Sequence, residues 1–165
     1  MPHRQRMYGH RARIGCTSPP ITAEVFPYEF YKIAPDGVTL AVATLAVTNN
    51  TKQELDQSYA RSITAARSMV DAGIDSIIFA GAPVLFSRGE QSNAAMVSSL
   101  EAMLGVRVTT TSAAQEKAAK MLGCKRAVIA HPYNASQHER QKSYATRIGC
   151  EVQPIRARWP YIRCR

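Results

Sequence analysis

Residues 71–83 read DAGIDSIIFAGAP, and the fold prediction starts from this stretch. Gly73 ends the helical pattern that precedes it, because glycine readily adopts the left-handed backbone found after many helices. The run from Asp75 to Gly81 is short, apolar and rich in β-branched or aromatic residues, which predicts a buried strand. The small residues Gly81-Ala82-Pro83 then predict a loop at the carboxyl end of that strand.

The same alternation extends along the chain in both directions. Further β-rich runs lie near residues 11–17, 38–47, 106–110, 126–131 and 150–155. Helical patterns separate the runs and end at Gly73, Gly105, Gly123 and Gly149. We therefore predict an α/β fold with a mostly parallel sheet and helices on both of its faces.

The predicted helices have recognisable first turns. Thr51-x-x-Glu54 forms a capping box, in which the hydroxyl and the carboxylate would satisfy free backbone amides. Ser112-x-x-Gln115 has the same form before the third helix, and Asn134 is the expected cap of the fourth. The second helix is expected to begin near Glu90.

The positive charge of the chain is concentrated at its ends. The net charge is +9, and eight arginines lie within residues 4–13 and 156–165. Without them the chain carries 13 basic and 12 acidic residues, so it lacks the basic face expected for binding a phosphate backbone. Nucleic acid is therefore an unlikely partner, and an RNA or membrane-surface binder that uses only the arginine-rich ends is the remaining alternative of this kind.

The sequence also bears on cellular location. No apolar run reaches the roughly 18 residues of a membrane span. The basic start MPHRQRMYGHRAR is not followed by the apolar segment of a secretory signal peptide. We predict a cytoplasmic protein in which Cys16, Cys124, Cys150 and Cys164 are reduced thiols.

Two similar short sequences indicate two lobes. RIGCTSP at 13–19 and RAVIAHP at 126–132 both read as strands that run into proline. The predicted divisions are a basic flexible tail over 1–11, a complete first lobe over 12–112, a linker helix with the start of a second lobe over 113–155, and a basic irregular tail over 156–165. We interpret the last segment either as an ordinary disordered tail or as the sign of a truncated or frame-shifted chain.

Candidate site residues lie in the loops after the predicted strands, since ligands of open α/β sheets bind beyond the carboxyl ends of the strands. These loops are residues 17–20, 47–51, 81–83, 110–112 and 131–134. Their small hydroxyl and amide side chains suit a carboxylate ligand, although the same residue types also serve as helix caps.

Several common motifs are missing from the sequence. It contains no GxGxxG or GxxxxGKS/T motif, which disfavours nucleotide cofactors, and no GxSxG motif, which disfavours a serine hydrolase. His131 and His138 do not have the spacing of helical metal ligands, so no metal site is expected.

The stretch GAPVLFSRGEQSNAAM at 81–96, followed by VRVTTTSAA at 106–114, resembles the aspartate/glutamate racemase superfamily. The nearest branch is that of arylmalonate decarboxylases and maleate isomerases, and the similarity runs from about Arg13 to Val152. The resemblance implies two similar lobes that close on a small carboxylic-acid substrate. It also implies chemistry through an enediolate without metal, pyridoxal phosphate or nucleotide.

The resemblance assigns expected roles to individual residues. Pro19 matches the proline after the first strand, and Tyr133 matches the tyrosine that hydrogen-bonds the retained carboxylate. Val47 and Leu55 fall where the decarboxylase branch lines its apolar pocket. Matching framework positions are Phe86, Arg88, Gly89 and Asn93. The substrate-binding residues expected in all are Pro19, Val47, Leu55, Gly81, Ala82, Pro83, Tyr133 and Asn134.

The chain also departs from the family pattern. Gly81-Ala82-Pro83 replaces a Gly-Thr-Ser sequence, which removes two hydroxyl donors and one amide hydrogen. Gly81 stands where racemases and maleate isomerases have their first catalytic cysteine, and the second family cysteine is expected beyond this chain. Cys150 and Cys164 do not match it. Cys16 is a candidate catalytic thiol, with a small buried apolar residue as the alternative reading.

The sequence thus predicts a cofactor-independent decarboxylase or cis-trans isomerase acting on a dicarboxylic or 2-substituted carboxylic acid. This chain alone would then complete only part of the cycle, because no proton donor is positioned. The alternative is a non-catalytic carboxylate-binding or interaction module derived from the same fold. Either reading is compatible with a homo-oligomer.

Overall fold

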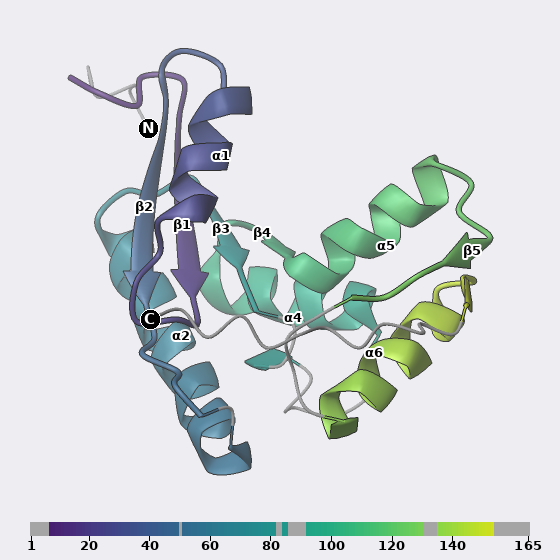
Figure 1. Cartoon of the computed structure of the whole chain (residues 1–165). Coiled ribbons are helices and arrows are strands. Elements are labelled where there is room, and N and C mark those ends of the chain that lie inside the picture. The colour runs from purple at the N-terminus through teal and green to yellow at the C-terminus, as the bar shows by residue number, and fades with distance from the viewer. Residues whose placement is uncertain (1–6, 50, 82–83, 86–91, 131–134, 154–165) are drawn as a thin grey trace, which may run out of the picture. The chain divides into compact units, whose positions relative to one another are not determined.

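The computed structural model describes residues 7–49, 51–81, 84–85, 92–130 and 135–153 (Figure 1). The chain divides into two compact units, Met1–Ala114 and Gln115–Arg165. Its elements are β1 (Ala12–Ser18), α1 (Val25–Ile33), β2 (Val38–Thr44), α2 (Lys52–Asp71), β3 (Ser76–Phe79), α4 (Asn93–Leu104), β4 (Arg107–Thr110), α5 (Thr111–Met121), β5 (Arg126–Ala127), α6 (Ala135–Arg147) and β6 (Glu151–Val152).

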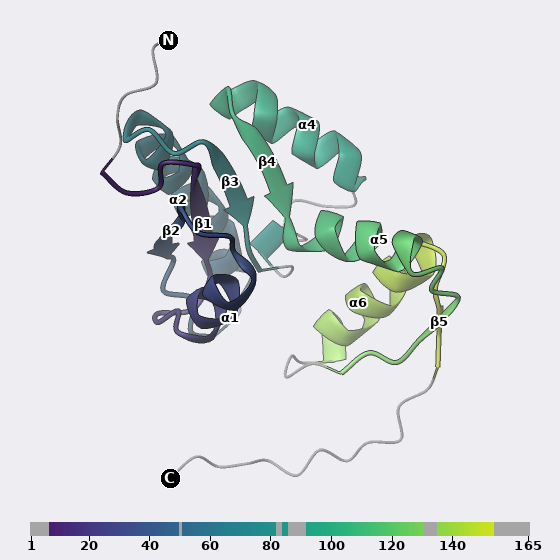
Figure 2. The same cartoon turned by 90° about the horizontal axis from the view of Figure 1, so that it is seen from above.

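The first unit is built on a four-stranded sheet of order β2-β1-β3-β4, in which all neighbouring strands are parallel. Ile14 is the register partner of Leu40 in β2 and of Ser76 in β3. Figures 1 and 2 show α1 on one face of this sheet and α2 and α4 on the opposite face. The predicted α/β class, with a parallel sheet and helices on both faces, is confirmed.

The core of the first unit lies between the sheet and helices α2 and α4. Strand β4 shows the alternation that produces it, because Val108 and Thr110 are buried whereas Arg107 and Thr109 are exposed. The buried apolar cluster consists of Ala66, Ile74, Ile77, Phe79, Leu85, Met96, Leu100, Leu104 and Val108. This cluster fixes the strands whose carboxyl ends form the candidate site.

Helix α1 is an element that the sequence did not predict. Its first residue follows Glu24, whose side chain makes no capping hydrogen bond, and it contains Pro27 in its first turn. Proline is tolerated there because the amides of a first turn have no intrahelical acceptor. No residue of α1 is buried, and Tyr28 and Ile33 are 62% and 85% exposed. The signals used for the other helices, a polar cap and a terminal glycine, are therefore missing here.

The first turn of α2 confirms one half of the predicted capping box. The Thr51 hydroxyl accepts a hydrogen bond from the Glu54 amide at 3.2 Å. The Glu54 carboxylate does not return to the Thr51 amide but accepts from the amides of Thr48 (2.6 Å) and Asn49 (2.9 Å). The Glu54 side chain thus connects Thr48 and Asn49 of the preceding loop to the first turn of α2 by hydrogen bonds.

The predicted start of α5 was wrong by two residues. The helix begins at Thr111, and the Thr110 hydroxyl accepts from the Ala113 amide at 3.0 Å. Ser112 is buried, and its hydroxyl lies 3.2 Å from that of Thr110. Three adjacent threonines and a serine, residues 109–112, all have cap chemistry, so the sequence could not decide between them.

The four glycines predicted to end helices are confirmed in that role. All have positive φ angles, which are 84° at Gly73, 69° at Gly105, 60° at Gly123 and 89° at Gly149. Each lies just after a helix, where the left-handed conformation lets the chain leave the helix axis. The predicted strand over 38–47 is instead shorter than expected, because β2 ends at Thr44 and Ala46 has a φ of 55°.

The second unit contains a two-stranded parallel sheet in which Arg126 of β5 pairs with Glu151 of β6. Both strands are shorter, within the described residues, than the predicted runs 126–131 and 150–155. Asn134, the predicted cap of α6, lies outside the described residues. Among the residues that the structure describes, none of the helices combines the length and apolarity needed to span a membrane.

Candidate functional site

The candidate site is the carboxyl edge of the four-stranded sheet, where β1 and β2 continue into paired loops. The Leu45 amide donates to the Ser18 carbonyl, and the Val47 amide donates to the Pro19 carbonyl, both at 2.8 Å. Between these two hydrogen bonds Ala46 adopts its positive φ. The pairing places Val47 beside Pro19, although the two residues are far apart in the sequence.

Gly81 joins the same edge from β3. The Ala80 amide donates to the Thr17 carbonyl at 2.9 Å, which holds the end of β3 beside the end of β1. A Cβ atom at Gly81 would overlap Cγ of Pro19 and lie 3.0 Å from its Cδ. Gly81 also has a φ of 91°, which side-chain-bearing residues rarely adopt. Glycine is therefore required here both by backbone conformation and by the close approach of Pro19.

Three of the predicted site residues, Pro19, Val47 and Gly81, are thus brought together. Leu55 lies in the first turn of α2, where its side chain is only 3% exposed and its amide donates to the Thr51 carbonyl at 2.9 Å. Its pocket-lining role stays a prediction. The other predicted binding residues, Ala82, Pro83, Tyr133 and Asn134, lie outside the described residues, as do Phe86, Arg88 and Gly89.

Cys16, the candidate thiol, is completely buried in β1. Its Sγ lies 3.8 Å from the Thr17 carbonyl oxygen. Burial raises the pKa of the Cys16 thiol to about 12, because the thiolate would lose its hydration. Cys16 is therefore a protonated thiol at neutral pH that solvent does not reach.

The hydroxyl groups of this edge are used in two different ways. The Thr110 hydroxyl caps helix α5, which is the alternative role expected for hydroxyl residues in these loops. By contrast, among the residues that the structure describes, the buried Thr17 hydroxyl of β1 and the buried Ser58 hydroxyl of α2 have no hydrogen-bond partner. Buried hydroxyls without partners are uncommon in folded proteins because each carries a desolvation cost. Thr17 belongs to the candidate loop 17–20 predicted from the sequence, whereas no sequence pattern indicated Ser58.

The pairing of the β1 and β2 loops was also not predicted. Ala46 has a positive φ although alanine gives no local signal for that conformation. The side chain of Arg61 adds a hydrogen bond to the Leu45 carbonyl at 3.3 Å. These contacts join segments distant in sequence, so only the folded chain reveals them.

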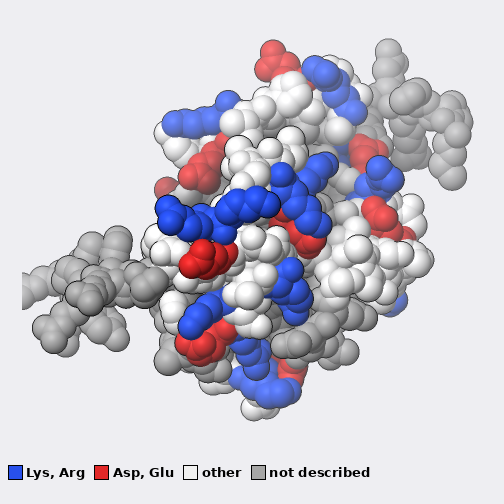
Figure 3. Space-filling view, turned by 90° about the vertical axis from the view of Figure 1, so that its right-hand side faces the viewer, with Lys and Arg blue, Asp and Glu red and all other residues white. Residues whose placement is uncertain are grey.

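Charged side chains on the described surface are mixed in sign. Figure 3 shows Lys and Arg interspersed with Asp and Glu on the face that it presents. Among the described residues, two ion pairs follow helical i, i+4 spacing, Lys52 with Asp56 at 2.8 Å and Glu116 with Lys120 at 2.6 Å. Within the described ranges no group of three or more His, Cys, Asp or Glu side chains could hold a metal ion.

The parallel α/β sheet with helices on both of its faces agrees with the aspartate/glutamate racemase-like class of folds that the sequence predicts. The sequence model of the arylmalonate decarboxylase family matches residues 14–158, and the chain belongs to that family. A comparison with curated proteins found no match.

Solved structures agree with this assignment of the fold. The maleate isomerase Iso from Pseudomonas putida S16 superposes with a TM-score of 0.73 at 22% identity, over 86% of this chain and 62% of that one. The maleate cis-trans isomerase of Nocardia farcinica gives 0.73 at 16% identity, over 87% and 64%. An arylmalonate decarboxylase gives 0.63 at 24% identity, over 88% and 64%. The chain therefore spans a little under two thirds of the length of these structures.

Proposed function

We propose that this chain belongs to a cofactor-independent enzyme that decarboxylates or cis-trans isomerises a dicarboxylic or 2-substituted carboxylic acid through an enediolate-type intermediate. Membership of the arylmalonate decarboxylase family supports this proposal. So does a structural relative, a variant of the Pseudomonas putida S16 maleate isomerase crystallised with maleate, at 25% identity and a TM-score of 0.75. A cytoplasmic location and a homo-oligomeric state remain predictions.

The observation that carries the proposal is the meeting of Pro19, Val47 and Gly81 at the carboxyl edge of the sheet. With no Cβ, Gly81 allows Pro19 to approach its backbone closely, which brings the loops after β1 and β3 together at this edge. Neutral amide and hydroxyl donors around one carboxylate would stabilise the charge that develops as an enediolate forms. Under the proposal, the loop of Ala82 and Pro83 and the loop of Tyr133 and Asn134 supply the remaining contacts.

A second candidate function follows from the proton-transfer step, which requires a positioned proton donor. Cys16 is buried and protonated, and Gly81 carries no thiol, so neither offers a positioned donor at this edge. This observation favours a module that binds a carboxylate without turning it over.

Phenylmalonate and maleate distinguish the two candidates. Binding to the full chain is measured by calorimetry, release of carbon dioxide by a coupled assay, and conversion of maleate to fumarate by absorbance. Turnover that persists in Cys16→Ser identifies an enzyme that does not use the buried thiol. Binding without turnover identifies the carboxylate-binding module. If neither binding nor turnover occurs, both candidates are wrong.

Tyr133→Phe tests the carboxylate contact itself. Loss of a hydrogen bond to a charged group costs about 1.5–3 kcal/mol, so phenylmalonate affinity should fall roughly 10- to 150-fold. Tyr28→Phe is the matched control, because Tyr28 is exposed on α1 and the same hydroxyl is removed. Equal affinities for the two variants would contradict the role proposed for Tyr133.

A further inference from the structure

The second unit ends its two helices in the same way, and each ending places a cysteine after a glycine. After α5, the Gly123 amide donates to the Lys120 carbonyl at 3.2 Å and the Cys124 amide to that of Ala119 at 2.9 Å. After α6, the Gly149 amide donates to Thr146 at 3.0 Å and the Cys150 amide to Ala145 at 2.9 Å. This is the Schellman pattern, in which the residue after the glycine usually contributes an apolar contact. Here both positions carry thiols.

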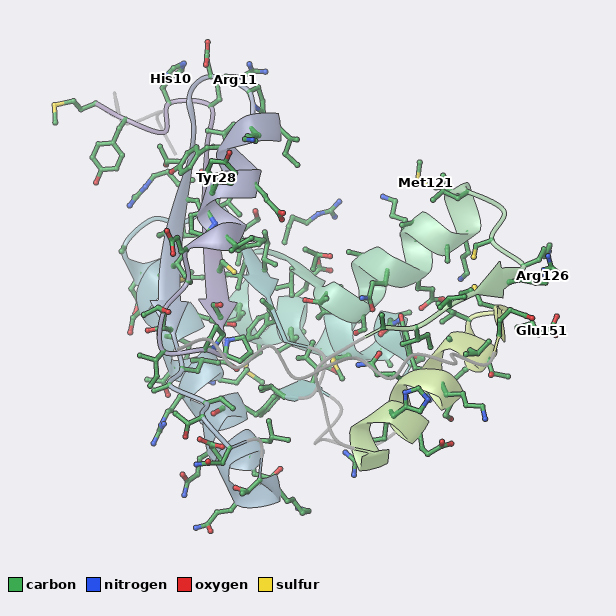
Figure 4. All side chains as sticks on the ribbon, in the orientation of Figure 1. His10, Arg11, Tyr28, Met121, Arg126 and Glu151 are labelled. Atoms are coloured by element: carbon green, nitrogen blue, oxygen red, sulfur yellow. The ribbon has the colours of Figure 1, made fainter. Side chains whose placement is uncertain are left out.

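The parallel pairing of β5 and β6 brings these two positions to the same edge of the small sheet. Arg126 is the register partner of Glu151, and Figure 4 shows the two labelled side chains on neighbouring strands. The Glu151 amide donates to the Lys125 carbonyl at 2.8 Å, which extends the ladder back toward Cys150 and Cys124.

The spacing of such neighbours suits a disulfide. One strand separation combined with one residue of rise gives a Cα separation of about 6 Å. Disulfides in proteins span Cα separations of about 4.4–6.8 Å. A Cα separation of this size therefore lies within the range that a disulfide bridges.

Contacts between the two cysteines support this reading. The Cys150 thiol donates to the Cys124 carbonyl oxygen at 3.5 Å. A hydrogen-bonding interaction with the Cys124 side chain raises the pKa of Cys150, burial and charge repulsion from Cys124 add to the increase, and Lys125 opposes it. Cys150 is 4% exposed whereas Cys124 is half-buried. One thiol is thus sheltered and the other is reachable from solvent.

We propose that Cys124 and Cys150 form a dithiol that closes reversibly to a disulfide, with a low-molecular-weight disulfide such as oxidised glutathione as the oxidant. The thiolate of Cys124 attacks one glutathione sulfur, forming a mixed disulfide and releasing one glutathione thiolate. Cys150 then loses its proton and attacks the Cys124 sulfur, and the second glutathione thiolate leaves. The two cysteine protons end on two glutathione thiols, and the glutathione disulfide is reduced as the cysteine pair is oxidised.

The disulfide would join the start of β5 to the start of β6. It would close a loop between positions that are 26 residues apart, and so restrict the unfolded second unit. Under reducing conditions the pair would stay open, which agrees with the reduced thiols expected from the sequence. The proposal does not depend on the carboxylate site of the first unit.

The test uses the full chain carrying Cys164→Ser, because Cys164 lies outside the described residues. The protein is incubated with oxidised glutathione and analysed by mass spectrometry before and after dithiothreitol. The expected product is lighter by two hydrogen atoms and yields a linked peptide that contains Cys124 and Cys150. Dithiothreitol should restore the starting mass. Buried Cys16 should stay unmodified and serves as an internal control.

Two further variants in the same background complete the test. With Cys150→Ser, the reaction should stop at a stable mixed disulfide on Cys124, and with Cys124→Ser the modified fraction should drop severalfold because Cys150 is sheltered. Circular dichroism checks that each variant is folded. The proposal is overturned if the Cys164→Ser chain itself retains bound glutathione on Cys124, or if neither cysteine reacts while the urea-unfolded chain does.

Discussion

The two units of the chain differ in the length of their strands and in the contacts that surround them. In the first unit, β1 and β2 each have seven residues, and a continuous apolar cluster supports the sheet. In the second, β5 and β6 each have two residues, and each strand follows a helix that ends in the same pattern of backbone hydrogen bonds. The first unit can position groups at a fixed edge, whereas the second depends on local backbone contacts. We infer that the first unit holds the edge with Pro19, Val47 and Gly81 of the proposed carboxylate site, and that the proposed dithiol belongs to the second.

The largest expected effect comes from the core of the first unit. Phe79 in β3 is almost fully buried within the apolar cluster, so Phe79→Ala should reduce the free energy of unfolding by about 3–5 kcal/mol. Urea denaturation measures the loss. Tyr144→Ala, at a buried position in α6, provides the comparison and should cost less. An equal or larger loss at Tyr144 would show that the second unit is packed as firmly as the first.

An alkaline pH dependence should follow from Cys16. Its folded pKa of about 12 lies above the ordinary value of 9.0, so the protonated thiol stabilises the fold below pH 9.0. That stabilisation should fall by roughly 1 kcal/mol per pH unit as pH rises from 9.0, until the folded thiol also titrates. Urea unfolding of the chain and of Cys16→Ala across this range isolates the effect of the thiol. A stability difference independent of pH would contradict the burial of this group.

Substitution of Gly81 probes the edge of the sheet on which the site is built. Gly81→Ala forces a side chain into positive φ, at about 1–2 kcal/mol, and adds overlap with Pro19, at about 1–3 kcal/mol. Gly105→Ala is the matched control, since Gly105 has a positive φ but no atom within 4 Å of the added Cβ. Thermal unfolding should show the greater loss for Gly81→Ala. Equal losses would mean that the Pro19 contact does not constrain this position.

The smallest predicted effect is a difference in stability between alanine substitutions at two serines of α2. Ser58→Ala should stabilise the chain by about 1 kcal/mol, because it removes a buried hydroxyl that lacks a partner. Ser62→Ala should destabilise it by about 1 kcal/mol, because the Ser62 hydroxyl donates to the Tyr59 carbonyl at 2.6 Å. Chemical denaturation of both variants checks the opposite signs, and a loss of stability in Ser58→Ala would show that this hydroxyl has a favourable interaction.

Local signals explain why most of the fold could be predicted. Apolar runs identified the strands, and glycines such as Gly73 and Gly105 identified helix ends, because both depend on nearby residues. Helix α1 was missed since Pro27 and an uncapped Glu24 gave the opposite signal. Thr110 was missed as a cap because Ser112 has the same chemistry.

The candidate site could be predicted only in part. Pro19, Val47 and Gly81 were identified through the resemblance to a family, but their contacts depend on the pairing of distant segments. The same holds for Cys124 and Cys150, which no motif links in the sequence and which only the β5-β6 register brings together. Long-range contacts of this kind leave no local pattern.

The most direct test of the central claim is a nuclear magnetic resonance titration of the isotope-labelled chain with phenylmalonate. If the carboxyl edge of the four-stranded sheet holds the carboxylate, the amide signals of Val47 and Gly81 should shift with a common saturation curve. Those of Arg126 and Glu151 in the second unit should stay unchanged. Shifts confined to the second unit, or no saturable shift at Val47 and Gly81, would contradict the account.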